Sequence, residues 1–350
     1  MTSCVWSRKK KLNFGGVFAI IAFWTLPEAS TLAQASLVPS KINLVIGTNA
    51  GGGYDLYGRL VARHMGRFLD GKPAFMAANM PGAGQLIMAN WLSNVAPKDG
   101  SALGLIPSTT AFERLFGNLQ ANYEARNFKW VGSLNGYATV AAVWHESQAQ
   151  KAGDLLTREV VIGGGAPSSD VTIWPNLMNN ILKTKLRVVS GYVGTNQISM
   201  ALEAREVEGM IGADWDGIKL SKPDWVRDGK IRILMQFAKE KHRDLSSVPT
   251  VFEFVRSEDD KKLFELFIDR QAYGRPFALP PGTPEATVKA FRMGFESMLV
   301  DIDFQKEAER LGATIDSATG QEVTSLVERV YTSPKPLLER ASVELQRASK

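Results

Sequence analysis

Two glycine-rich loops hold the residues best suited to chemistry in this chain of 350 residues. The first is Gly51-Gly52-Gly53, between an apolar run and a helical pattern, and the second is the segment NMPGAGQL at 79–86. Glycines at such a junction let successive amide groups face one point, where the helix N-terminus adds partial positive charge. One such loop is usually a plain tight turn. Two loops at one sheet edge favour an anion-binding site.

The spacing of these glycines excludes the common nucleotide-binding motifs. The G-x-G-x-x-G motif would need a glycine where Leu56 stands, and G-K-[ST] occurs nowhere in the chain. Catalytic patterns are missing as well, because the chain has no G-x-S-x-G elbow and no Ser–His–Asp set at strand ends. The three histidines lack metal-ligand spacing. We therefore expect a binding protein, not an enzyme, with no metal and no cofactor.

The first 35 residues predict a Sec signal peptide. Four consecutive basic residues, Arg8 to Lys11, precede a 13-residue apolar run from Phe14 to Leu26, and Ala33 and Ala35 form an A-x-A cleavage pattern. The apolar run is shorter than the ~20 residues of a membrane-spanning helix, which disfavours an anchor. We therefore expect cleavage before Ser36 and a periplasmic protein.

Removal of that segment changes the charge of the protein. The full chain has a net charge of +5, and the leader contains four basic residues and one acid, so the remainder carries +2. This weakens any nucleic-acid interpretation, and we expect no nucleic-acid partner. The single cysteine, Cys4, also lies in the leader, so the mature chain can form neither disulfides nor thiolate metal sites.

The glycine loops are positioned by alternating apolar runs and helical periods. Strands are expected at 41–47, 73–80, 102–107, 159–165, 186–192, 208–214 and 231–237. Helices are expected at 54–68, 83–94, 169–183, 196–205, 215–221, 285–300, 303–311 and 320–347. Such alternation with short connections predicts parallel sheets covered by helices.

Two further extended segments, 130–147 and 271–284, separate two such α/β units. The sequence therefore predicts a two-lobed α/β fold, in which each lobe is a mainly parallel sheet flanked by helices. We expect lobe 1 to comprise 36–140 plus 275–350 and lobe 2 to comprise 141–274. The chain would cross near 138–144 and return near 271–278, and these two crossing strands would form a hinge.

Three stretches of the chain resemble one known family. They are GGGYDLYGRLVARHM, NMPGAGQLIMANWLSNVAPKDGSALGLI and RPFALPPGTPEATVKAF, and the resemblance covers about 41–325. They are similar to the periplasmic substrate-binding receptors of tripartite tricarboxylate transporters, the Bug-type receptors. The resemblance implies a Venus-flytrap fold whose cleft binds a small carboxylate, held by backbone amides and waters and not by an arginine. The positions so implied, with Tyr54 between them, are Gly51, Gly52, Gly53, Asp55, Pro81, Gly82, Ala83 and Gly84.

The lobe 2 candidates come from loops at the ends of the predicted strands. We expect them to include Ser168, Ser169, Asp170, Tyr192, Thr195, Asn196, Asp214 and Trp215. Several candidate residues have an alternative, structural interpretation. Asp55 would pair with Arg59 at i+4. Ser168 to Asp170 would cap a helix, and Asp214 and Trp215 would be a cap and a core residue.

The leading functional hypothesis is a monomeric receptor that delivers a small organic carboxylate to integral-membrane permease subunits. The alternative is a sensor or regulatory partner of a signalling kinase, because both functions use the same cleft. An acid at Asp214 disfavours a second carboxylate nearby, and aromatic walls favour an apolar body. We therefore expect a mono- or dicarboxylate with a hydrophobic portion and not citrate.

Overall fold

The computed structural model of the protein describes residues 37–167 and 169–348. The predicted signal peptide at 1–35 and the candidate Ser168 lie outside the described residues. Within the described ranges, no helix combines the length and the apolar character needed to cross a membrane.

The first sheet contains the strands that precede both glycine loops. It has six strands, in the order β11 (Ala318–Thr319), β4 (Lys129–Ser133), β10 (Pro276–Leu279), β3 (Ala102–Leu105), β1 (Lys41–Ile46) and β2 (Ala74–Asn79). β1 pairs in parallel with β2 and β3, whereas β10 runs antiparallel between β3 and β4. The flanking helices are α1 (Gly53–His64), α2 (Leu86–Asn94), α9 (Glu285–Leu299), α10 (Ile302–Leu311) and α11 (Gly320–Tyr331).

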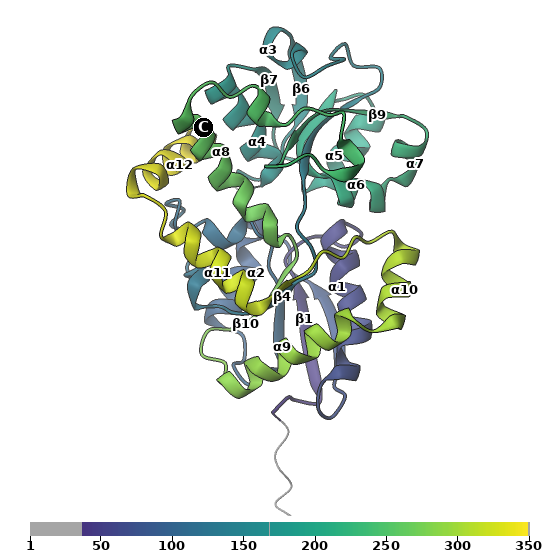
Figure 1. Ribbon diagram of the computed structural model, residues 1–350, viewed down its shortest axis with the longest axis vertical. Helices are drawn as coiled ribbons and strands as arrows, with labels where there is room; N and C mark the ends of the chain where they lie inside the picture. The colour runs from purple at the N-terminus through teal and green to yellow at the C-terminus, as the bar shows by residue number, and fades with distance from the viewer. Residues whose placement is uncertain (1–36, 168, 349–350) are drawn as a thin grey trace, which may run out of the picture. The chain divides into compact units, whose positions relative to one another are not determined.

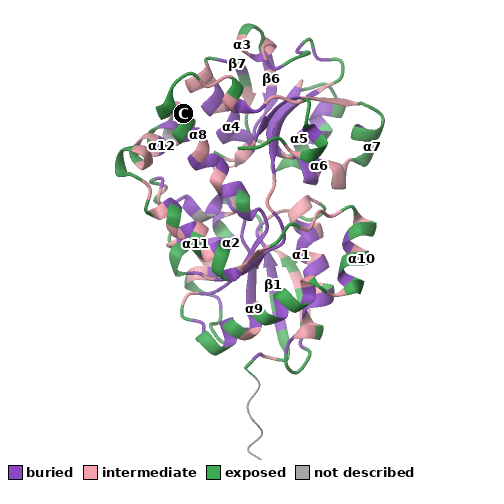
Figure 2. Ribbon diagram, in the orientation of Figure 1, coloured by how far each residue is buried: buried purple, intermediate pink, exposed green. Residues whose placement is uncertain are grey.

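The second sheet has five strands, in the order β7 (Lys185–Val189), β6 (Glu159–Gly163), β8 (Gly209–Asp214), β5 (Thr139–Trp144) and β9 (Ile231–Phe237). β6 pairs in parallel with β7 and β8, and β5 runs antiparallel between β8 and β9. Its helices are α3 (Asp154–Thr157), α4 (Asp170–Leu177), α5 (Thr195–Glu203), α6 (Trp215–Ser221), α7 (Pro223–Arg227) and α8 (Glu258–Asp269). The central strands of each sheet are buried, and the helices turn their exposed faces outward (Figure 2).

We call the first sheet with its helices lobe 1 and the second sheet with its helices lobe 2. The chain passes from β4 to β5 through 134–138, and it returns from α8 to β10 through the turn Arg270–Tyr273 and the two residues after it. These crossings lie next to the expected segments 138–144 and 271–278. Thr139–Trp144 and Pro276–Leu279 are strands of the sheets themselves, and the crossings are the short irregular segments before them.

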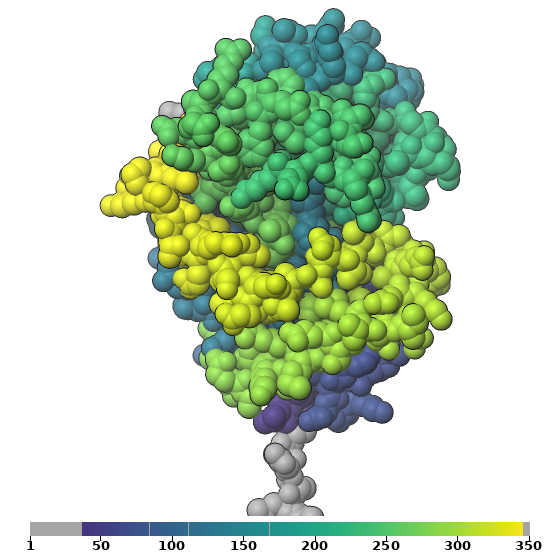
Figure 3. Space-filling model, viewed as in Figure 1, coloured from purple at the N-terminus to yellow at the C-terminus, as the bar shows by residue number. Residues whose placement is uncertain are grey.

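The C-terminal tail connects the two lobes. The expected helix 320–347 is in fact two helices, α11 and α12 (Lys335–Ala348), separated by Thr332–Pro334. Proline lacks the backbone N–H that a continuous helix would need there. α12 lies against α4 and α8, with Arg340 paired to Asp260 of α8. In Figure 3 this yellow segment runs over the surface from lobe 1 to lobe 2.

Lobe 2 is built on an aromatic core that the helical periods alone do not predict. The Trp174 ring of α4 is fully buried, and it stacks on Phe237 of β9 at 4.4 Å between ring centroids. Phe264 of α8 stacks on the same indole at 6.2 Å. This packing fixes α4, whose first residues face the cleft, against the second sheet.

Candidate ligand-binding cleft

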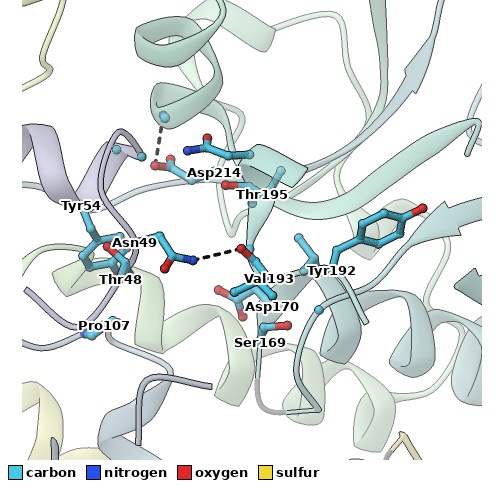
Figure 4. Close-up of a pocket in the computed structure, with 18 of the residues that line it drawn as sticks. Thr48, Asn49, Tyr54, Pro107, Ser169, Asp170, Tyr192, Val193, Thr195 and Asp214 are labelled. Carbon is cyan, nitrogen blue, oxygen red and sulfur yellow. Dashed lines mark hydrogen bonds between the residues drawn. The ribbon is translucent and has the colours of Figure 1, made fainter. Parts of the chain in front are cut away.

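A cleft of about 600 Å³ lies where the carboxyl ends of the parallel strands of both lobes meet. Lobe 1 contributes the loops after β1, β2 and β3, and lobe 2 contributes the loops after β6, β7 and β8. This volume falls within the about 300–1,000 Å³ of small-molecule sites. Figure 4 shows side chains from both lobes around it, including Asn49, Tyr54, Asp170, Tyr192 and Asp214.

Three helices direct N-termini without a side-chain cap at this cleft. They are α1, α4 and α5, whose capping residues Gly52, Ser169 and Gly194 form no side-chain capping bond. All three capping residues line the cleft. The first amides of a helix have no partner within the helix, and the helix dipole gives this end a partial positive charge. The cleft is therefore suited to an anion.

The first glycine loop is only partly directed at the cleft. Gly52, Gly53 and Tyr54 line it, but Gly51 does not, because its amide donates to Oδ2 of Asp55 at 2.9 Å. The predicted contact of Gly51 with the ligand stays a prediction. Gly51 has a φ of +82°, a conformation that glycine adopts without strain, so its role is to shape the turn.

Asp55 also lies away from the cleft surface. Its carboxylate accepts from Arg59 at 3.0 Å and from the amide of Asn79 at 2.9 Å. Burial is the largest single influence and would raise the pKa of Asp55, but the bonds from Arg59, Gly51 and Asn79 together lower it. Of the two interpretations of Asp55, the geometry favours the structural one. Its contact with a ligand stays a prediction.

The second glycine loop supplies Pro81, Gly82 and Ala83 to the cleft wall. The role predicted for Gly84 stays a prediction. Gly82 has a φ of +124°, and a Cβ there would meet the Ile87 side chain at 2.6 Å. Only glycine adopts this backbone without strain.

Lobe 2 contributes most of its predicted residues to the cleft: Ser169, Asp170, Tyr192, Thr195, Asn196 and Asp214. Trp215 is the exception. Its ring is 5% exposed and belongs to the lobe 2 core, and its Nε1 donates to Asp244 at 3.4 Å. Asp214 lines the cleft and Trp215 does not, because successive residues at a helix start point in different directions. The specificity role of this pair stays a prediction.

Asp214 caps α6 and is held by an arginine that sequence reasoning missed. Its carboxylate accepts from the amides of Asp216 at 3.2 Å and Gly217 at 3.0 Å, and also from Arg275. Burial raises the pKa of Asp214, and the Arg275 charge opposes that rise. The carboxylate therefore has both a capping role and a place on the cleft wall.

Arg275 is a fully buried cation on the wall of the cleft. Its guanidinium carbon lies over three tyrosine rings, at 5.0 Å from the centroid of Tyr54, 4.7 Å from Tyr57 and 5.5 Å from Tyr137. Burial would lower the pKa of Arg275, but Asp214 raises it above the usual range. The residue stands in the returning segment GRPF, which matched the family pattern, but a lone arginine beside a strand carries no local signal of a site.

A second missed residue, Tyr137, links the two lobes. Its hydroxyl lies 2.9 Å from Oγ of Ser108 in the loop after β3, and it donates to Oδ2 of Asp170 at 3.0 Å. The other carboxylate oxygen of Asp170 accepts from the buried Arg270 at 3.4 Å. Burial raises the pKa of Asp170, which the Arg270 charge counters. Both acids on the lobe 2 wall are thus paired with an arginine of the returning segment.

The lobes touch across the mouth of the cleft. Nδ2 of Asn49, after β1, donates to the carbonyl of Val193, before α5, at 3.0 Å (Figure 4). Nearby, Thr314 of lobe 1 donates to Asp216 of lobe 2 at 3.1 Å. The N-termini of α1 and α5 therefore approach the same region from opposite lobes. No cluster of three or more potential metal-ligating side chains occurs in the part of the chain that the structure describes.

The comparisons with known proteins concern the fold. No protein-family model matches the sequence, and the search of curated proteins found no match. Among solved structures, the periplasmic binding protein BugD has a TM-score of 0.67 at 17% identity, covering 89% of this chain and 98% of its own. MatC from Rhodopseudomonas palustris, with bound malate, has a TM-score of 0.65 at 19% identity, covering 87% and 98%. A further R. palustris protein, with adipate, has a TM-score of 0.66 at 19% identity, covering 88% and 97%.

These structures match nearly their whole length to this chain, and they include the Bug type to which the loop motifs pointed. At identities below 20%, the shared property is the architecture. The chain has the two-lobed α/β fold of the Bug-type periplasmic solute-binding proteins.

Proposed function

We propose that the protein is a periplasmic receptor that binds a small organic carboxylate between its lobes and delivers it to the membrane subunits of a tripartite tricarboxylate-type transporter. The observation that carries the proposal is the convergence of the α1, α4 and α5 N-termini, none with a side-chain cap, on one cleft. An anion placed there satisfies amides that would otherwise need water. Two proteins of the same fold contain malate and adipate, which are both carboxylates.

The carboxylate is held on the amides of Gly52 and Gly53 and of Gly82 and Ala83. Hydrogen bonds to a charged group contribute about 1.5–3 kcal/mol each, so a few amides suffice to hold a small anion without a free arginine. Arg275 is already paired with Asp214 through its Nη2. Its role is to keep an acid on the cleft wall from repelling the ligand.

The contact between the α1 and α5 ends gives the anion a role in closure. A Cβ added to Gly51 would lie 3.8 Å from the side-chain nitrogen Nδ2 of Asn196. The N-terminal ends of α1 and α5 are therefore close in this conformation. An anion that touches both ends stabilises the closed arrangement, as in other proteins that close around a ligand. A receptor of this kind presents a different surface to its transporter when loaded.

The charge pairing in lobe 2 bears on the ligand's second end. Since Asp170 and Asp214 are each paired with an arginine, neither excludes a dicarboxylate by net repulsion. The ligand class supported by the site is therefore a mono- or dicarboxylate with an apolar body. The tyrosine and proline side chains Tyr54, Tyr137 and Pro107 on the wall suit that body.

A thermal-shift screen of organic acids tests the binding function. A ligand that binds only the folded state raises the melting temperature progressively with its concentration. We expect at least one mono- or dicarboxylate to do so, and its uncharged amide analogue to have no effect. The delivery role predicts that deletion of the receptor gene abolishes uptake of that acid by cells. A panel in which no acid shifts the melting temperature would contradict the proposal.

A further inference from the structure

A second cavity, of about 360 Å³, lies next to the cleft. Lobe 1 contributes to it through Leu86 and the segment 116–120, and lobe 2 contributes through Ala166 and Pro167. Ala83, Ala166 and Pro167 line both this cavity and the cleft. The cleft and the second cavity are therefore separated by small side chains, Ala83 from lobe 1 and Ala166 and Pro167 from lobe 2. Opening of the lobes would move these side chains apart.

The walls of the second cavity suit an apolar body. Leu86 and Phe116 are nearly fully buried behind its surface, and Leu119 at its edge is 82% exposed. Leu345 of α12 lines it from the tail. Leu119 is thus exposed to water next to buried apolar side chains. A ligand that covered it would remove this unfavourable contact with water.

One buried acid faces this cavity with part of its bonding capacity unused. Glu113 is 6% exposed and lines the cavity, and its Oε2 accepts from the Asn118 amide at 2.7 Å. Among the described residues it forms no ion pair, because the nearby Arg270 is bonded to Asp170. Burial raises the pKa of Glu113 to about 7. A buried carboxyl without an ion pair is costly unless a partner meets it.

We propose that the ligand of the cleft is an elongated acid that extends past Ala83 and Ala166 into the second cavity, where Glu113 bonds a hydrogen-bond donor at its far end. The ligand class is a carboxylic acid with an apolar middle and a distal hydroxyl or amide group. This inference rests on the proposed function, since the carboxylate remains on the lobe 1 amides. It adds the length of the ligand and the chemistry of its other end.

Calorimetric titration of the purified protein with straight-chain acids tests the inference. The probes are 6-hydroxyhexanoic acid, decanoic acid and 10-hydroxydecanoic acid. Each buried methylene strengthens binding about fourfold, so we expect the two long acids to bind at least about tenfold more tightly than the short one. The distal hydroxyl should add about tenfold over decanoic acid through its bond to Glu113.

Two variants locate the effect in the second cavity. Ala166→Leu should weaken both long acids about tenfold by filling the connection, and Glu113→Leu should remove only the gain from the hydroxyl. Glu113→Leu should change the affinity for the short acid by no more than about twofold. Ala166→Leu should weaken the short acid less than the long acids, because Ala166 also lines the cleft. Retained affinity for 6-hydroxyhexanoic acid also shows that each variant is folded.

The outcomes distinguish failure of this inference from failure of the proposed function. If short and long acids bind with equal affinity, or if Ala166→Leu weakens all three equally, the extended site is refuted while the receptor function stands. If no acid of any length binds, the proposed function fails, and this inference fails with it.

Discussion

Arg275 donates from Nη2 to Oδ2 of Asp214, and this pair joins the returning segment of the chain to the end of β8 in lobe 2. Both residues line the cleft, with side chains 1% and 19% exposed. The pair thus binds the two lobes together at the wall of the site. It also neutralises an acid that would otherwise repel an anionic ligand.

The first prediction concerns the stability of this pair. Arg275→Met should lower the free energy of unfolding by about 3 kcal/mol, since it leaves a buried carboxylate without its cation. Asp214→Asn should have a similar effect through the unpaired arginine. The free energy of unfolding of the double variant should fall by less than the sum of the two single decreases, because both single decreases include the same Arg275–Asp214 interaction. Urea unfolding monitored by tryptophan fluorescence measures all three.

An exposed pair provides the matched control. Arg205 and Glu146 form an ion pair whose side chains are 70% and 44% exposed. Arg205→Met should lower the free energy of unfolding by less than about 1 kcal/mol. Equal losses for Arg205→Met and Arg275→Met would show that burial of the Arg275 pair has no special effect.

The second prediction separates the two glycine loops. Gly82→Val should lower the melting temperature by several degrees, because a φ of +124° is strained for any side chain. Gly52→Val should leave the melting temperature of the ligand-free protein nearly unchanged. Its φ is −90°, and the nearest atom to an added Cβ lies 4.0 Å away. An unchanged melting temperature for Gly82→Val would contradict the backbone assignment.

The third prediction concerns the bond across the cleft mouth. Asn49→Ala removes the only side-chain donor to the Val193 carbonyl that the described residues provide, and a bond of this kind contributes about 0.5–1.5 kcal/mol. The dissociation constant for the ligand should rise about two- to tenfold, mainly through faster dissociation. Stopped-flow measurement of association and dissociation rates checks this.

Asn94→Ala is the control for that change. The Asn94 amide bonds the carbonyls of Asn90 and Asn122 within lobe 1, away from the cleft. Ligand dissociation should be unaffected in this variant. If Asn49→Ala likewise leaves the dissociation rate unchanged, the cross-lobe bond does not hold the closed form.

The fourth prediction is a pH dependence due to Glu113. Burial raises the pKa of this carboxyl to about 7, above the value of the unfolded chain near 4.5. The folded state then binds more protons between these values, so this contribution to stability is complete below about pH 4.5 and is lost as the pH rises to about 7. Glu113→Gln should reduce that loss by an amount on the order of 3 kcal/mol.

Urea unfolding of both proteins at pH 5 and pH 8 measures the difference. The side chain of Gln cannot titrate but keeps the shape of Glu, so the comparison isolates the proton. Parallel changes in the two proteins between these pH values would mean that Glu113 is ionised throughout.

The alternation of strands and helices could be predicted from the sequence because local residue patterns specify it. The predicted strand 41–47, helix 54–68 and strand 73–80 correspond to β1, α1 with its 3-10 extension Met65–Phe68, and β2. Helix α8 was not predicted, although Ser257 caps it and acids fill its first turn. Its apolar residues are spaced for burial against Trp174, a partner distant in sequence.

Likewise, some residues of the candidate site could be predicted from the sequence and others could not. Loop residues such as Gly52, Ala83 and Thr195 lie in the loops that follow strands, so the sheet-edge rule brings them to the cleft. Arg275 and Tyr137 reach it from the crossing segments, whose placement depends on how the lobes pack. Trp215 was assigned to the site for its type, but its position after the Asp214 cap directs it into the core. Residue type and spacing do not resolve such long-range effects.

The most direct test of the central claim is calorimetric titration of the acid found by screening into the Gly52→Val variant. Gly153→Val is the matched control, because Gly153 lies outside the cleft and an added Cβ meets nothing within 4 Å. If the carboxylate is held on the amides of the first loop, Gly52→Val should weaken binding about 100-fold, the equivalent of one to two charged-group hydrogen bonds. Gly153→Val should bind like the unmodified protein. Equal affinity in a folded Gly52→Val variant would contradict the account and leave the first glycine loop as a turn.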